Sequence, residues 1–264
     1  MNPATTDPAP LVFITGASSG IGQALALQYA RQGYRLALVA RRCQPILDWL
    51  NAAGIESERF RVYAADVRQV EDMVAVGRAC ITELGLPDVV IANAGISAGM
   101  DTAELADLET LRISLETNVL GMAATFHPFL AGMFKRRTGT LVGIASVAGI
   151  RGLPGHGAYC ASKAAAINYC ESLRGECRSF GLQVVTLAPG YVDTPLTSGN
   201  RYAMPFRLSS EEFARRAVRA IARGRSYAVI PWQMAILAKW LRVLPNAVFD
   251  RALARRPRKQ RRTN

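Results

Sequence analysis

The feature that most constrains the fold of this chain is the alternation of short apolar runs with longer amphipathic segments. The short runs have the length and the Val, Ile and Leu content of strands, and they comprise residues 11–15, 35–40, 61–66, 88–94, 139–146, 182–189 and, as a candidate seventh, 227–231. The segments between them have helical periodicity and comprise residues 20–32, 44–53, 69–84, 108–136, 157–180 and 209–224.

Continuous apolar strands are typical of a sheet that is covered on both faces, as parallel sheets are. Strands that alternate with helices at this spacing, joined by right-handed crossovers, predict an α/β fold. We therefore expect a doubly wound, mainly parallel sheet of six to seven strands with helices on both faces, which is a Rossmann fold.

The length of 264 residues suits one large domain, and the interior shows no linker or repeat. We expect a single domain over 1–264 with a flexible lead at 1–10. That lead has no basic n-region or apolar h-region, and the five cysteines form no CxxC pair, which favours reduced thiols in the cytoplasm. Two histidines without cysteine pairs at ligand spacing predict no metal site.

A glycine-rich segment, TGASSGIG at Thr15–Gly22, connects the first strand directly to the first helix. Glycine permits the tight turn and lets backbone N–H groups approach a pyrophosphate, while the start of the helix attracts the anion. A close-packed turn is the alternative interpretation. The position between strand and helix favours dinucleotide binding.

The residues at the end of the second strand indicate which dinucleotide, NAD(H) or NADP(H), the chain binds. NAD-binding proteins place an acid there to accept a hydrogen bond from the ribose 2′-OH. Here the position is Ala40, and Arg41 and Arg42 follow. A guanidinium binds a 2′-phosphate bidentately, so we expect NADP(H) in preference to NAD(H). The alternative is that both arginines are solvated loop residues.

A tyrosine and a lysine lie four residues apart in YCASK, and Ser146 precedes Tyr159 across a loop rich in glycine and proline. One helical turn places Lys163 on the same face as Tyr159, where its charge, together with that of an oxidised nicotinamide, would lower the pKa of the phenol toward neutrality. Taken alone, the pair could be surface neighbours.

In this order along the chain, the motifs resemble the classical short-chain dehydrogenase/reductase family, and the resemblance extends to about residue 195. The motifs that carry it are TGASSGIG, Asp66 and Val67 in AADV, ANAG at Ala92–Gly95, Asn118 in TNVLG, Ser146, YCASK and PGYVDT at Pro189–Thr194. Ala92 replaces the usual asparagine, so we expect one stabilising side-chain hydrogen bond to be missing and the fold to be unaffected.

The resemblance implies that Tyr159 is the general acid/base, that Ser146 binds the carbonyl oxygen, that Lys163 binds the nicotinamide ribose and that Asn118 holds a water linked to Lys163. Together with the two arginines, it predicts a cofactor site formed by Gly16, Ser18, Ser19, Gly20, Ile21, Gly22, Arg41, Arg42, Asp66, Val67, Asn93, Ala94, Gly95, Tyr159, Lys163, Pro189, Gly190, Val192 and Thr194.

The carboxyl terminus, 231–264, combines an amphipathic helix at 232–244 with a basic tail. The helix would be about 20 Å long, too short to span a bilayer. Removing the seven basic residues of 251–264 lowers the formal net charge from +12 to +5. The helix is either an interfacial anchor on an anionic membrane or a packing element over the substrate or a second subunit.

We therefore expect a cytoplasmic, NADP(H)-dependent carbonyl reductase or alcohol dehydrogenase that acts on an apolar or lipid-like small molecule as a homodimer or homotetramer. A non-catalytic NADP(H)-binding regulator is the alternative. A specific nucleic-acid reader is not expected, because no helix-turn-helix, RNP or zinc-finger pattern accompanies the basic tail.

Overall fold

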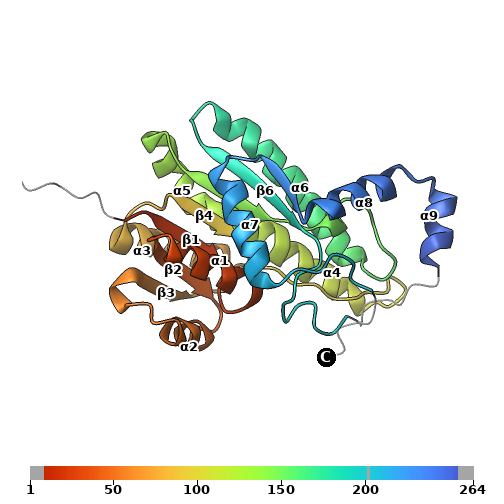
Figure 1. Ribbon diagram of the computed structural model, residues 1–264, viewed down its shortest axis with the longest axis horizontal. Coiled ribbons are helices and arrows are strands. Elements are labelled where there is room, and N and C mark those ends of the chain that lie inside the picture. Colours follow the sequence, from red (N-terminus) through yellow and green to blue (C-terminus); the bar gives the residue numbers. More distant parts are fainter. Residues whose placement is uncertain (1–8, 201–202, 255–264) are drawn as a thin grey trace, which may run out of the picture.

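The structure, a computed structural model, describes residues 9–200 and 203–254. A sheet of seven parallel strands forms its centre, in the order β3-β2-β1-β4-β5-β6-β7 (Figure 1). The strands are β1 Leu11–Thr15, β2 Arg35–Ala40, β3 Phe60–Ala64, β4 Val89–Ala92, β5 Thr140–Ile144, β6 Gln183–Pro189 and β7 Tyr227–Ile230. The expected doubly wound fold is confirmed, and the candidate seventh strand is present.

Helices cover both faces of the sheet, because successive residues of each strand point to opposite sides. In β1, Val12 and Ile14 pack in one core cluster with α1, α2 and α7, whereas Leu11 and Phe13 pack in the other with α3, α5 and α6. The helices of these two layers are α1 Gly20–Arg31, α2 Gln44–Ala52, α7 Ser210–Ala222, α3 Val70–Leu84, α5 Gly121–Arg136 and α6 Gly157–Arg178. Ala92 is buried in β4, so its departure from asparagine leaves the sheet intact.

The segment 108–136, expected to be one helix, consists of three parts. An α-helix α4, Asp107–Leu115, passes into a π-helical turn η2, Glu116–Leu120, and then into α5. Both Thr117 and Asn118 of this turn are buried. Single π-helical turns inside α-helices frequently occur at functional sites. The periodicity of one short turn within a long helical pattern is too brief a signal to separate from the α-helices on either side.

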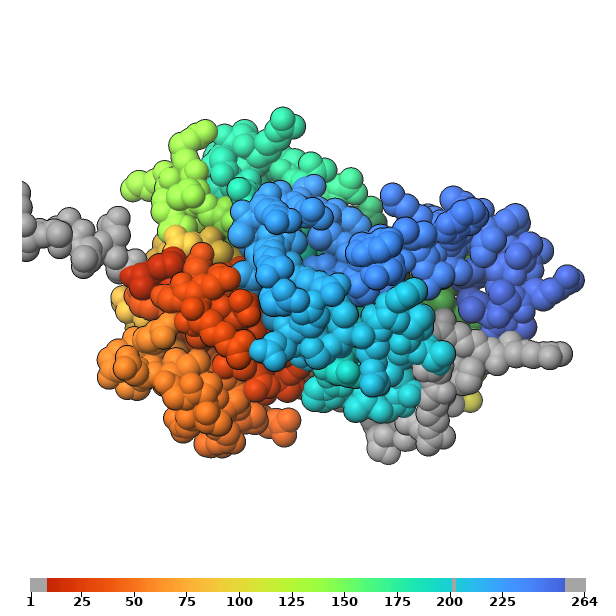
Figure 2. All heavy atoms as spheres, viewed as in Figure 1, coloured from red at the N-terminus to blue at the C-terminus, as the bar shows by residue number. Residues whose placement is uncertain are grey.

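Two short 3₁₀ turns connect elements, η1 Ser57–Arg59 and η3 Val147–Gly149. After β7 the chain forms α8 Trp232–Val243, close to the expected 232–244, and a further helix, α9 Asn246–Leu253. These two helices extend from one end of the molecule, opposite β3 and α2 (Figures 1 and 2). Most of the expected lead, 1–8, and most of the basic tail, 255–264, lie outside the described residues.

Candidate active site

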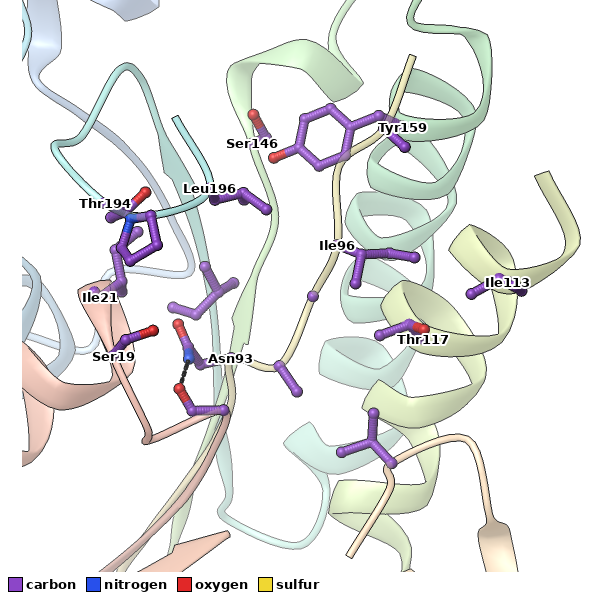
Figure 3. A pocket seen from close by; sticks show the side chains of 18 of the residues that line it. Ser19, Ile21, Asn93, Ile96, Ile113, Thr117, Ser146, Tyr159, Thr194 and Leu196 are labelled. Atoms are coloured by element: carbon purple, nitrogen blue, oxygen red, sulfur yellow. Dashed lines mark hydrogen bonds between the residues drawn. The ribbon is translucent and has the colours of Figure 1, made fainter. Parts of the chain in front are cut away.

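A cavity of about 1030 Å³ opens at the carboxyl edge of the sheet, where the strand order reverses between β1 and β4. Its walls come from the β1–α1 loop on one side and from α4 and the π-helical turn on the other, as Ser19 and Ile21 facing Ile113 and Thr117 show (Figure 3). Every residue expected at the site lines this cavity except Gly22, Arg42 and Asn118.

The β1–α1 loop lies against the segment after β4. The Asn93 side-chain amide donates to the carbonyl oxygens of Thr15 (3.0 Å) and Gly16 (3.1 Å), and the Thr15 hydroxyl accepts from the backbone of Asn93 (3.2 Å). Gly16 has φ +68° and Gly22 packs on it: a Cβ at Gly22 would lie 2.2 Å from the Gly16 oxygen. Only glycine fits at both positions.

Basic side chains meet the cavity where the second and third strands end. Arg41 and Arg42 are both exposed, and of the two Arg41 lines the cavity. Arg68, which the sequence reading missed, also lines the cavity and donates to both carboxylate oxygens of Asp66 from Nε and Nη2 (2.8–3.2 Å). This hydrogen bond lowers the pKa of Asp66, so its carboxylate is charged at neutral pH. Arg41, Arg68 and Asp66 therefore lie together at this end of the cavity, and Glu109 of α4, which interacts with Arg68, also lines it.

The hydroxyls of Ser146 and Tyr159 face each other across the other end of the cavity (Figure 3). Ser146 follows β5 and its Oγ accepts from the Ala148 backbone N–H (3.1 Å), which leaves its own proton free to donate. Burial raises the pKa of Tyr159, and the hydrogen bond with Ser146 opposes that rise.

Lys163 is buried one turn further along α6, with 4% of its surface exposed. Its Nζ donates to the carbonyl of Ile144 (2.8 Å) and lies 6.0 Å from the centre of the Tyr159 ring. Burial lowers the pKa of Lys163 to about 8. Desolvation is the largest influence on the pKa of Tyr159 and outweighs the hydrogen bond with Ser146. The expected decrease in this pKa, which requires the charge of an oxidised nicotinamide as well as that of Lys163, stays a prediction.

Asn118, in the π-helical turn, is almost fully buried and does not line the cavity. Its Oδ1 accepts from the Ile96 backbone (2.9 Å), and its Nδ2 donates to the Ile96 carbonyl (3.0 Å) and to Ser162 Oγ (2.9 Å). Both amide hydrogens are thus in use. The side chain fixes the segment after β4, and the expected water at Asn118 stays a prediction.

The loop after β6 covers the cavity from the remaining side. The Gly190 N–H donates to the Ile230 carbonyl (2.8 Å), and Val192 pairs with Leu208. The Thr194 N–H donates to Thr197 Oγ1 (3.2 Å). Pro189, Gly190, Val192 and Thr194 all line the cavity beside the β1–α1 loop.

A second cavity, about 620 Å³, adjoins the first and shares Ser146 and Tyr159 with it. Most of its lining is apolar, including Met234, Leu237 and Leu241 of α8. Among the described residues that line it there is no acid. The two hydroxyls therefore lie between a cavity with acidic and basic groups and a mostly apolar one whose described lining includes the cation Arg151.

Sequence reasoning missed Arg68, the wall formed by Ile113 and Thr117, and the contribution of α9 to the second cavity. Arg68 could have been predicted from the sequence, because it follows β3, the strand next to β2, and the carboxyl ends of parallel strands meet at one edge of the sheet. Among the described residues, no group of three or more His, Cys, Asp or Glu side chains could hold a metal ion.

Comparison with known proteins gives matches over most of the chain. The sequence model of the short chain dehydrogenase family matches residues 10–204. An uncharacterized oxidoreductase of Myxococcus xanthus is 40% identical over 246 residues, covering 92% of this chain and 96% of that protein. Two solved structures also match: a short-chain dehydrogenase from Streptomyces avermitilis (TM-score 0.80, 25% identity, 89% and 92% of the two chains) and an alcohol dehydrogenase from Thermococcus sibiricus complexed with 5-hydroxy-NADP (TM-score 0.73, 28% identity, 84% and 96%).

Proposed function

Because this chain belongs to the short-chain dehydrogenase family of oxidoreductases, we propose that it interconverts a carbonyl and a secondary alcohol with NADP(H), on an apolar or lipid-like substrate. The observation that carries the proposal is the pair of facing hydroxyls, Ser146 and Tyr159, shared by a charged cavity and an apolar one. Lys163 lies buried beside them.

The first cavity fits a dinucleotide. Added Cβ atoms at Gly16 and Gly22 would lie 2.8 Å from Ala94 Cα and 2.2 Å from the Gly16 oxygen, so glycine lets the loop pack closely on itself and on the segment after β4. The loop lines the cavity next to the start of α1, where an anion would be favoured. Arg41 and Arg68 would hold the 2′-phosphate. The choice of NADP(H) over NAD(H) is also supported by the alcohol dehydrogenase from Thermococcus sibiricus, whose structure contains 5-hydroxy-NADP.

When bound, NADPH supplies the hydride that reduces a carbonyl carbon. Ser146, whose Oγ is oriented by the Ala148 N–H, would donate to the carbonyl oxygen as negative charge develops there. Tyr159 would then give its proton to that oxygen. The raised pKa of Tyr159 keeps the phenol protonated at neutral pH, which is the form that a reductase needs at the start of each turnover.

The second cavity supports the choice of an apolar substrate. Its volume of about 620 Å³ lies within the common range for small-molecule sites, roughly 300–1,000 Å³. Aliphatic side chains of η3, α8 and α9 make up much of its lining, and Arg151 is the charged residue among the described lining residues. No described acid lines it, so a cationic substrate would lose hydration without gaining a partner. A non-catalytic NADP(H)-binding regulator would not need the buried Tyr159–Ser146 pair.

The proposed partners are a second copy of the chain and an anionic membrane surface inside the cell. Leu105, Leu108 and Leu115 are exposed on and before α4, which supports a homodimer or homotetramer. The outer face of α8 carries Trp232 (63% exposed) and Trp240 (66%), beside Lys239 and Arg242. Exposed tryptophans next to basic residues are typical of interfacial helices. No helix in 9–200 or 203–254 is long and apolar enough to cross a bilayer.

The test of the reaction is Tyr159→Phe, which removes the transferable proton and keeps the ring. We expect NADPH-dependent reduction of a panel of ketones to fall by about 10²–10⁴-fold, the usual contribution of general acid catalysis, while NADPH still binds. Tyr169→Phe, on the same helix, is the matched control. Near-normal turnover in Tyr159→Phe would show that the chemistry has been assigned to the wrong residue.

A further inference from the structure

One side chain, Arg151, joins the loop that follows Ser146 to both carboxyl-terminal helices. Its Nη1 donates to the carbonyl oxygens of Leu241 and Leu244 (the latter at 2.8 Å), and its Nη2 donates to Asn246 Oδ1 (3.0 Å). Its guanidinium carbon lies 3.7 Å from the centre of the Phe249 ring. A single planar cation thus binds the end of α8, the start of α9 and the middle of α9.

The helix α9 needs contacts such as these in order to be stable. A helix of eight residues is too short to be stable by itself, since isolated helices need roughly 12–15 residues. Phe249 is the buried residue of α9, and Arg151 stacks on it. The last carbonyls of α8 lack partners within their own helix, so Arg151 also satisfies one of these groups.

A reciprocal bond strengthens the same junction. Arg242 of α8 donates to the carbonyl of Ile150 (3.3 Å), the residue before Arg151. Ile150 in turn donates its N–H to Val147, next to Ser146. The position of the two terminal helices is therefore coupled through a short rigid loop to the residue that faces Tyr159.

The helices that Arg151 holds form part of the apolar cavity. Leu237 and Leu241 of α8 and Ala252 and Leu253 of α9 line it, on the side away from the charged cavity. Both helices extend from the end of the molecule with little else around them (Figures 1 and 2). Apart from its contacts with Arg151, α9 has one buried side chain among its described residues, that of Phe249.

We propose that Arg151 is a positioning residue that holds α8 and α9 against the apolar cavity and thereby determines how tightly bulky apolar substrates bind. The proposal rests on the proposed function in one respect, that this cavity receives the substrate. Arg151 itself lines the cavity, but its hydrogen bonds go to the two helices and to Leu244 between them and not to the reacting atoms. A bulky substrate that reaches α9 should depend on it far more than a small ketone that occupies only the space beside Tyr159.

The test uses the full chain and two probes with the same reactive group, cyclohexanone and the fused-ring ketone 1-decalone. For Arg151→Met we expect the ratio of kcat/KM for 1-decalone to that for cyclohexanone to fall about tenfold, mainly through KM, since several charge-assisted hydrogen bonds are lost. Arg151→Lys keeps the charge without the planar fork and should give an intermediate ratio. Arg251→Met, which removes an exposed cation from α9 itself, is the matched control.

A second measurement requires no turnover. Amide hydrogen exchange across 245–254 should be faster in Arg151→Met than in the unmodified chain, with the sheet unchanged, and Phe249→Leu should give a smaller change in the same direction. Unchanged exchange there, or an equal loss for both ketones, would overturn the proposal. If the unmodified chain reduces neither ketone, the proposed function fails for these substrates, and calorimetric binding of 1-decalone together with the exchange result still decides the role of Arg151.

Discussion

At the scale of single residues, the charge of Lys163 is sensitive to pH in the physiological range. Burial disfavours its ammonium form and lowers its pKa to about 8, so the group titrates close to physiological pH. As the pH rises through that value, the side chain loses its positive charge and one of its three N–H donors, which weakens the proposed binding of the nicotinamide ribose.

We therefore expect kcat/KM for ketone reduction to be constant below pH 7 and to decrease above about pH 8. The decrease should approach tenfold per pH unit, because one group loses one proton. The measurement is a pH–rate profile at low NADPH, which reports the free enzyme. A flat profile to pH 10 would mean that Lys163 keeps its proton or that its charge has no part in the reaction.

The two arginines after β2 were interpreted from the sequence as a pair, and the structure separates them. Arg41 lines the cavity with Arg68, and Arg42 does not. Arg41→Ala should weaken NADPH binding about tenfold more than NADH binding, because a charge-assisted hydrogen bond to the 2′-phosphate contributes about 1.5–3 kcal/mol. Arg42→Ala should have a smaller effect. Fluorescence titrations with both cofactors measure this, and equal losses with NADPH and NADH would show that Arg41 does not bind the phosphate.

At the scale of elements, the β1–α1 connection shows how tightly the backbone is packed around the site. A Cβ on Gly22 would lie 2.2 Å from the Gly16 carbonyl oxygen, which belongs to the main chain and cannot rotate away. Gly22→Ala should therefore displace the loop, lower the free energy of unfolding by about 1–3 kcal/mol and weaken NADPH at least tenfold.

The matched control for this substitution is Gly175→Ala, inside α6. A Cβ there meets nothing within 4 Å. Alanine in an open helical position should raise stability by roughly 0.5–1 kcal/mol and leave NADPH affinity as it is. Thermal melting and NADPH titration of both variants make the comparison, and similar behaviour of the two would refute the packing argument.

At the scale of the whole molecule, the distribution of charge and apolar surface predicts reversible attachment to anionic membranes. Residues 255–264 contain six basic residues, and the exposed stripe of α8 adds Trp232, Ile236 and Trp240. Each Lys or Arg near such a surface contributes about 1 kcal/mol, and salt screens this attraction, whereas insertion of the tryptophans is insensitive to salt.

The full chain should sediment with vesicles of phosphatidylserine and phosphatidylcholine and not with phosphatidylcholine alone. Deletion of 255–264 should weaken binding and flatten its dependence on salt, and Trp232→Ala with Trp240→Ala should weaken what remains. Failure of the full chain to bind anionic vesicles at low salt would exclude this mode of attachment. Loss of the oligomer in the tryptophan variant would instead identify the stripe as a subunit interface.

The sequence by itself was enough to predict the sheet, its helical layers and most of the candidate site. Strand residues such as Val12 and Ile14 are apolar without interruption because both faces are covered, and that pattern is local. Loop residues such as Gly16 lie beside strand ends, so their place at the carboxyl edge follows from the topology alone.

Only the tertiary structure decided which side chains face the cavity and which groups surround them. It brings Arg68 to the same cavity as Arg41, engages both amide hydrogens of Asn118 in hydrogen bonds, and buries Lys163, which lowers the pKa of that side chain. It also brings α9 to Arg151, about a hundred residues earlier. Burial and contact between distant segments depend on the three-dimensional surroundings of each residue, and no spacing within the chain encodes them locally.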